Sequence, residues 1–242
     1  MLYKTRAVVL NHLRYGDNSL ITTLYTETHG RKTFLIQGFT SRKSKFHATF
    51  FQPFTLLNLE IDISPKRELQ HIKEISFAHS FQTIPFDTVK RAVTLFLAEV
   101  LYKTLREEEP NPSLFEYVYH TLQLLDIKEN GSANFHLLFL MHLTKHLGFY
   151  PIDNYSETNC VFDTVNGRFY QFISSQSKAG DQTNSFLIHK LLSLPFDQLE
   201  LLQLNHLTRN SLLNLIIEFY QVHLGSLGEV KSLPVLQSVF EE

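Results

Sequence analysis

The fold of the chain is decided near its beginning, by residues 7–36, AVVLNHLRYGDNSLITTLYTETHGRKTFLI. Three runs of apolar, β-branched and aromatic residues alternate there with turn signals at 15–18 and 28–30, which predicts three short strands. Pro53 opens a fourth run over residues 54–63, and a fifth covers 69–77. Five short strands without a long helix among them are typical of a small closed barrel, such as an OB-fold.

Helical periodicity replaces the strand pattern after Pro85. Helices are predicted over 87–109, from 112 onward, over 132–148, over 183–193 and over 198–224, and a polar stretch with two short strands interrupts them at about 149–181. Asp87 and Asn111 are predicted N-caps, and Gly148 is a predicted helix end. The prediction is therefore an α+β chain. An OB-fold barrel over residues 1–80 precedes a mainly helical domain over 81–242 with an irregular, partly β insert.

Charge is divided unevenly between these two parts. Residues 1–80 hold eleven Lys and Arg against six Asp and Glu, a net charge of +5, although the whole chain has a net charge of −2. Such an asymmetry predicts that the first domain faces a polyanion. Chance variation in a solvated surface explains the same numbers equally well when composition alone is considered.

The densest functional signal is the segment 38–46, GFTSRKSKF, which places three cations and three hydroxyls between two phenylalanines. Cations neutralise phosphates, hydroxyls donate to phosphate oxygens, and aromatic rings stack on bases. The alternative is a solvated basic loop that its phenylalanines anchor to the barrel. The residues predicted to contact DNA are Arg14, Arg31, Lys32, Phe39, Arg42, Lys43, Lys45 and Phe46.

Motifs for catalysis and metal binding are weak or missing. His142 and His146 have the i, i+4 spacing of a helical zinc site, but Leu143 stands where a zinc peptidase needs glutamate, and no third ligand is evident. Cys160 is the only cysteine, which excludes an internal disulfide and a zinc site built from thiolates. We therefore expect a protein that is not an enzyme, without metal or cofactor. Without a long apolar run or a secretory signal, we expect no membrane contact and a cytoplasmic location.

The joint order of several short motifs resembles the RecO family. These motifs are Ala7–Leu10, Tyr15-Gly16-Asp17, Gly30-Arg31, Gln52-Pro53, His146–Pro151 and Tyr220-x-x-His223-Leu224-Gly225. The resemblance implies an amino-terminal OB-fold and a helical carboxy-terminal domain. It implies binding to single- and double-stranded DNA, annealing of complementary strands, and help in loading RecA onto strands coated by single-stranded-DNA-binding protein (SSB). The implied protein partners are RecR and the acidic tail of SSB.

The chain departs from the family at two places. Many members carry a four-cysteine zinc element in the insert, where this chain keeps only Cys160. Instead, four aromatic residues are expected to hold the insert in place: Phe162, Phe169, Tyr170 and Phe172. In some members, arginines of the helix that ends at this Leu-Gly motif help to grip the SSB tail, whereas residues 134–143 of this chain contain no Arg or Lys. The expected tail site therefore rests on Lys145, Phe149, Tyr150 and Arg209 in the helical domain.

Two other functions fit the sequence. An OB-fold that serves RNA or translation, with a helical docking domain, would prefer RNA over DNA in competition binding. A hydrolase whose site assembles from distant histidines and acids would lose its activity on chelation, but no recognisable motif supports it.

Overall fold

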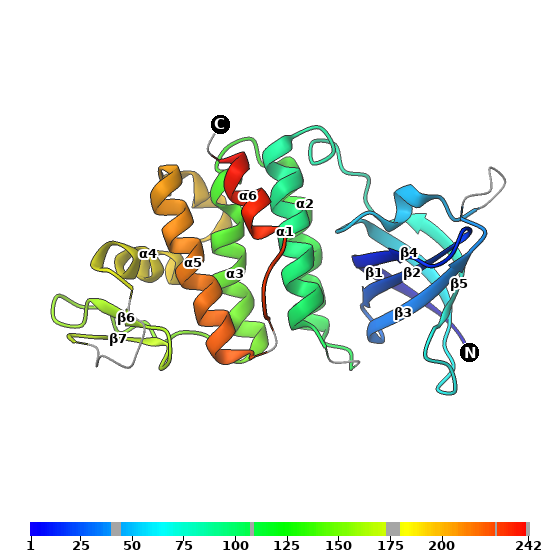
Figure 1. Cartoon of the computed structure of the whole chain (residues 1–242), viewed down its shortest axis with the longest axis horizontal. Coiled ribbons are helices and arrows are strands. Elements are labelled where there is room, and N and C mark those ends of the chain that lie inside the picture. Colours follow the sequence, from blue (N-terminus) through cyan, green and yellow to red (C-terminus); the bar gives the residue numbers. More distant parts are fainter. Residues whose placement is uncertain (40–44, 107–108, 173–179, 226, 241–242) are drawn as a thin grey trace. The chain divides into compact units, whose positions relative to one another are not determined.

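The computed structural model describes residues 1–39, 45–106, 109–172, 180–225 and 227–240 (Figure 1). The chain divides into two compact units, Met1–Ile127 and Lys128–Glu242. The first unit contains the barrel together with the first two helices, and the predicted domain boundary near residue 80 stays a prediction. The α+β class is confirmed, because five antiparallel strands precede a helical region. No described helix is both long and apolar enough to cross a membrane.

The first unit begins with a five-stranded barrel, as the sequence predicts. Its strands are β1 (Leu2–Arg14), β2 (Ser19–Thr26), β3 (Gly30–Gln37), β4 (Leu56–Asp62) and β5 (His71–Phe77), in the order β3-β2-β1-β4-β5. A parallel bridge between Phe34 and Gln70 brings the two edges together. The Leu35 amide donates to the Gln70 carbonyl at 3.1 Å, and the Gln70 amide donates to the Thr33 carbonyl at 2.8 Å. This closure gives the OB-fold barrel.

Strand β1 is much longer than the predicted run at 7–10, because both ends gain partners that the hydrophobic pattern does not show. Its first half pairs with β4, from Leu2 opposite Asp62 to Val8 opposite Leu56. Its second half pairs with β2 as far as Arg14, after a register shift beside Leu10. Backbone pairing alone extends the strand through polar residues. The barrel core contains Ala7, Val9, Leu20, Leu24, Phe34, Ile36, Phe51, Leu57, Leu59, Ile61 and Ile72.

A one-turn helix, η1 (Ala48–Phe51), precedes β4, and two long helices complete the first unit. Helix α1 (Thr88–Thr104) starts as predicted, because the Asp87 side chain accepts from the Lys90 amide. It ends five residues earlier than predicted, because Leu105 leaves the helical conformation. Helix α2 (Pro112–Ile127) starts after Asn111, whose side chain accepts from the Leu114 amide at 3.0 Å.

A buried carboxylate fixes the connection between the barrel and α1. Asp126, at the end of α2, is fully buried and accepts from the backbone amides of Gln82, Thr83 and Ile84 at 2.8–3.0 Å. The buried Lys90 ammonium donates to the Asp126 carbonyl at 2.9 Å and to the Thr83 hydroxyl at 2.6 Å. Desolvation raises the pKa of Asp126, but the amide donors outweigh it and hold that pKa below its usual value.

The second unit is helical around a central α3. Its helices are η2 (Ser132–Asn134), α3 (Phe135–Leu147), α4 (Gln182–Ser193), η3 (Phe196–Leu201), α5 (His206–His223) and α6 (Leu233–Val239). The helix predicted over 198–224 is wrong in its first part, because Asn205 caps a new helix by accepting from the Thr208 amide. Ser132 starts a one-turn helix and does not itself cap α3. Helix α6 has no prediction to match it.

A short hairpin of β6 (Val161–Asp163) and β7 (Arg168–Tyr170) occupies the insert, as predicted. Phe162 and Phe169 are fully buried and lie 5.2 Å apart between ring centroids, which agrees with the expectation that aromatic packing holds the insert. Tyr170 is half-buried. The expectation for Phe172 is wrong, since its side chain is 82% exposed.

Replacement of Gly148 with alanine is expected to lower the free energy of unfolding by about 1 kcal/mol. Gly148 ends α3 at φ 84°, and a Cβ there would meet open space, so the cost comes only from the left-handed backbone. Denaturant unfolding of the full chain measures this loss of stability. The matched control is Gly225→Ala, which also meets open space but has no positive φ. An equal loss in both variants would contradict this reasoning.

Candidate nucleic-acid interface

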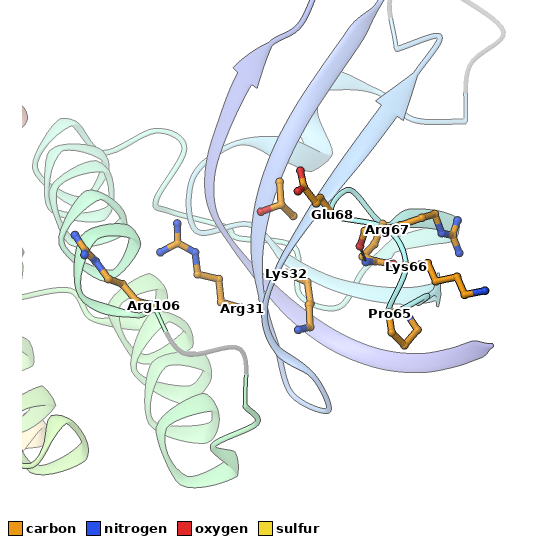
Figure 2. A pocket seen from close by; sticks show the side chains of 9 residues that line it. Arg31, Lys32, Pro65, Lys66, Arg67, Glu68 and Arg106 are labelled. Carbon is orange, nitrogen blue, oxygen red and sulfur yellow. Dashed lines mark hydrogen bonds between the residues drawn. The ribbon is translucent and has the colours of Figure 1, made fainter.

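A basic pocket of about 510 Å³ lies on the first unit, between the barrel and the end of α1 (Figure 2). Its lining residues are Arg31, Lys32, Thr33, Pro65, Lys66, Arg67, Glu68, Gln70 and Arg106. Five of them are cations and one is an acid. We call this site the basic pocket. Such an excess of positive charge around a hollow favours an anionic ligand with more than one charged group.

Two of the cations come from the start of β3. The strand begins at Gly30, whose φ of 59° lets the chain turn sharply before Arg31. The Arg31 guanidinium lies 4.6 Å from the centre of the Tyr102 ring and donates to the Tyr102 and Leu105 carbonyls at 2.8 and 2.7 Å. Figure 2 shows Arg31 and Arg106 on the helical side of the pocket and Lys32 on the barrel side. Arg31 therefore braces α1 against the barrel and also places its charge beside Lys32.

Lys66 and Arg67 lie on the loop between β4 and β5, which Gln70 holds in shape. The Gln70 side chain is buried, accepts from the Ser64 amide at 2.9 Å, and donates to the Ser64 and Arg67 carbonyls. Arg67 donates to the Asp62 carboxylate at 2.9 Å, and this bond lowers the pKa of Asp62. The loop is thus preorganised, with Lys66 exposed on it.

The predicted DNA contacts are only partly brought together. Arg31 and Lys32 line the basic pocket, whereas Arg42 and Lys43 lie outside the described residues. Lys45 pairs with the Glu74 carboxylate at 2.8 Å, and the Arg14 guanidinium lies 5.9 Å from the centre of the Phe39 ring.

Phe39 and Phe46 are half-buried and pack against the barrel core. This packing is the anchoring role that the sequence left open for the two rings. That the predicted residues contact DNA stays a prediction.

Sequence reasoning missed Lys66, Arg67 and Arg106 as site residues. The signal for the first two is their position as adjacent cations directly after Pro65, within the domain of positive charge. Arg106 carries no such signal, because three glutamates follow it along the chain. Only the approach of the end of α1 to β3 brings it to the pocket.

The residues predicted to bind a partner divide among different neighbours in the second unit. The Lys145 ammonium lies 4.4 Å from the centre of the Tyr150 ring, and the Tyr150 hydroxyl donates to the Leu192 carbonyl. Burial raises the pKa of Tyr150. The Phe149 ring stacks on His223 at 5.2 Å. Lys145 and Tyr150 therefore form a joint surface.

Arg209 is engaged elsewhere in the second unit. Its side chain is buried and donates to the Asn134 side chain and the Leu204 carbonyl, both at 2.8 Å. Burial lowers the pKa of Arg209. A carboxylate of a partner could reach this guanidinium only after it gives up these bonds.

Metal ligands do not gather in the part of the chain that the structure describes: no group of three or more His, Cys, Asp and Glu side chains is placed to hold an ion. His142 lies 3.3 Å from the Leu191 carbonyl, and burial lowers its pKa. The absence of zinc stays a prediction.

Comparison with known proteins gives matches over nearly the whole chain. The family model "Recombination protein O N terminal" matches residues 1–81, and "Recombination protein O C terminal" matches residues 85–234. Two similar relatives are each named "DNA repair protein RecO". The relative from Bacteroides fragilis is 38% identical over 245 residues, which covers both chains completely. The relative from Phocaeicola vulgatus is 35% identical over 240 residues, which covers 99% of this chain and all of the relative.

Proposed function

Since this chain belongs to the RecO family of DNA repair proteins, we propose that it is a non-enzymatic recombination mediator that binds DNA through its basic pocket. It binds single- and double-stranded DNA, anneals complementary strands, and helps RecR to load RecA onto SSB-coated DNA in the cytoplasm. The observation that carries the DNA-binding step is the set of five cations around one pocket on an OB-fold barrel. Family membership supports the role in repair and recombination.

The chemistry of the pocket suits a phosphate backbone better than a single base. Its polar groups are mostly cations, and Thr33 and Gln70 are the uncharged polar residues in its lining. Phosphate contacts hold a strand without reading its sequence, which is what annealing of arbitrary complementary strands requires. Arg31 and Arg67 are held by hydrogen bonds to partners on the protein, so their positive charges have fixed positions in the pocket. Together with Lys32, Lys66 and Arg106, they supply about five contacts to phosphate oxygens.

The SSB tail is proposed to bind the second unit at Lys145 and Tyr150. An acidic tail that ends in an aromatic residue needs a cation and an apolar surface. The ammonium of Lys145 over the Tyr150 ring offers both within 4.4 Å. Phe149 packs on His223 instead, and Arg209 is less suited because it is buried.

The affinity for a single-stranded oligonucleotide is expected to fall steeply as salt rises. With about five phosphate contacts, at about 0.7 released counterions per contact, the logarithm of the association constant falls with log salt at a slope of about −3 to −4. Fluorescence anisotropy with a labelled thymidine oligonucleotide between about 50 and 200 mM salt measures the slope. Affinity that barely changes over this range would contradict phosphate binding by the pocket.

A further inference from the structure

A second hollow on the first unit has the opposite character from the basic pocket and shares no lining residue with it. We call it the apolar groove. Its volume is about 670 Å³, and its lining residues are Thr49, Gln52, Pro53, Phe54, Thr55, Phe77, His79, Ser80, Phe81, Ile84, Pro85, Arg91, Thr94 and Leu95. Phe77 and Leu95 are 44% and 45% exposed, so large apolar side chains face solvent at this site. Exposed apolar surface gathered in a hollow marks a binding site more often than a chance feature.

Both walls of the apolar groove are held rigidly. On one side, the Asp126 carboxylate fixes the backbone of residues 82–84, and Lys90 ties Thr83 to the end of α2. On the other side, Phe54 is fully buried at a φ of 66°, and its amide donates to the Val9 carbonyl at 2.7 Å. A groove between fixed walls needs little rearrangement to receive a ligand, which favours affinity.

The charges at the groove have one sign. No Asp or Glu is among its lining residues, and Arg91 stands among them as an exposed cation on α1. Its guanidinium donates to the Thr88 hydroxyl at 3.2 Å and to the Pro85 carbonyl at 3.4 Å. Among the described residues, no carboxylate pairs with it. No negative charge in the described part of the chain therefore neutralises Arg91. Its guanidinium lies beside apolar surface, where a carboxylate of a ligand can pair with it.

We propose that the apolar groove binds a short acidic peptide segment of a partner protein. A bulky apolar side chain of the peptide lies against Phe77, Phe81 and Leu95, and a neighbouring carboxylate pairs with Arg91. Nucleic acid suits the groove less well, because one arginine cannot balance a run of phosphates. The inference goes beyond the proposed function and does not depend on DNA binding or on the tail site at Lys145.

The test uses the full chain and a fluorescein-labelled octapeptide, Glu-Asp-Glu-Phe-Leu-Asp-Glu-Glu, in fluorescence anisotropy. Saturable binding is expected, and Leu95→Glu and Arg91→Glu are each expected to weaken it at least about tenfold. Arg91→Lys keeps the charge but loses the planar fork that matches a carboxylate, so it is expected to weaken binding less than Arg91→Glu does. Both positions are exposed, so the variants are expected to keep the unfolding temperature of the unchanged chain.

Two control peptides and one control variant complete the test. Alanine in place of Phe-Leu, or lysine in place of the acids, is expected to abolish binding. Lys73→Glu, at an exposed cation that does not line the groove, is expected to leave binding unchanged, and Lys145→Glu separates this groove from the tail site in the second unit. The inference is overturned if no peptide binds up to about 1 mM, if the lysine peptide binds as well as the acidic one, or if Lys145→Glu removes binding while Leu95→Glu does not. DNA affinity of the Leu95→Glu variant, measured in parallel, separates a failure here from a failure of the proposed function.

Discussion

Single-stranded DNA is expected to bind about 100-fold more weakly at about 0.1 M salt when Lys32, Lys66 and Arg106 are all replaced by alanine. Each phosphate contact releases about 0.7 counterions, and this release raises the affinity about fivefold at this salt concentration. Loss of three such contacts therefore lowers the affinity about 100-fold. These side chains line the basic pocket and are exposed or half-buried, so their removal leaves the barrel core intact. The salt slope is expected to become less steep by about 2.

The matched control replaces three cations of the same unit that line neither the basic pocket nor the apolar groove: Lys4, Lys73 and Lys103. It removes the same net charge, so it separates a local contact from a general loss of positive charge. We expect its affinity to stay within about threefold of the unchanged chain and its salt slope to stay the same. Equal losses in the two triple variants would show that the protein attracts DNA by its overall charge and that the pocket has no special role.

The largest loss of stability is expected for Asp126→Ala, at about 3–5 kcal/mol in the free energy of unfolding. The substitution leaves the amides of Gln82, Thr83 and Ile84 without their acceptor in a buried place. It also removes the group that holds the connection to α1 in shape. Thermal unfolding of the full chain measures the effect, and Glu129→Ala, an exposed carboxylate three residues later, is expected to change little.

The same residue predicts a dependence on pH. Because folding lowers the pKa of Asp126, its contribution is complete above the usual value of 3.8 and is lost as the pH falls through the folded value. The difference in stability between the unchanged chain and Asp126→Ala is therefore expected to be constant from neutral pH down to about pH 5, and to narrow in stronger acid. A difference that narrows between pH 8 and 6 would point to another group.

The elements of the fold follow from the sequence where local chemistry is strong. Asp87, Asn111 and Gly148 occupy the helix ends that their side chains or backbone freedom predict. The barrel follows from the order of short apolar runs and turns. One error lies where a long-range partner decides the outcome, because the first half of β1 pairs with β4. Another is local, because Asn205, which caps α5, is not among the predicted N-caps.

The candidate site is harder to predict, because its cations come from three separate segments. Arg31 and Lys32 stand out in the sequence, but Lys66 joins them only because Gln70 closes the barrel and shapes the loop before it. Arg106 joins them because α1 ends at Thr104 and not near residue 109. The pattern of residues along the sequence shows neither the closure of the barrel at Gln70 nor the end of α1 at Thr104. The basic segment 38–46 attracts attention in the sequence, although its two phenylalanines pack toward the barrel core.

Strand annealing tests the central claim most directly. Two complementary labelled oligonucleotides, naked or coated with SSB from the same bacterium, are mixed with the unchanged chain or with the Lys32, Lys66 and Arg106 triple alanine variant, and duplex formation is followed by energy transfer. We predict that the unchanged chain accelerates annealing of both kinds of strand. The triple variant is expected to lose most of this acceleration, whereas the Lys4, Lys73 and Lys103 control keeps it. Annealing that the unchanged chain does not accelerate, or that the triple variant accelerates equally well, would contradict the account.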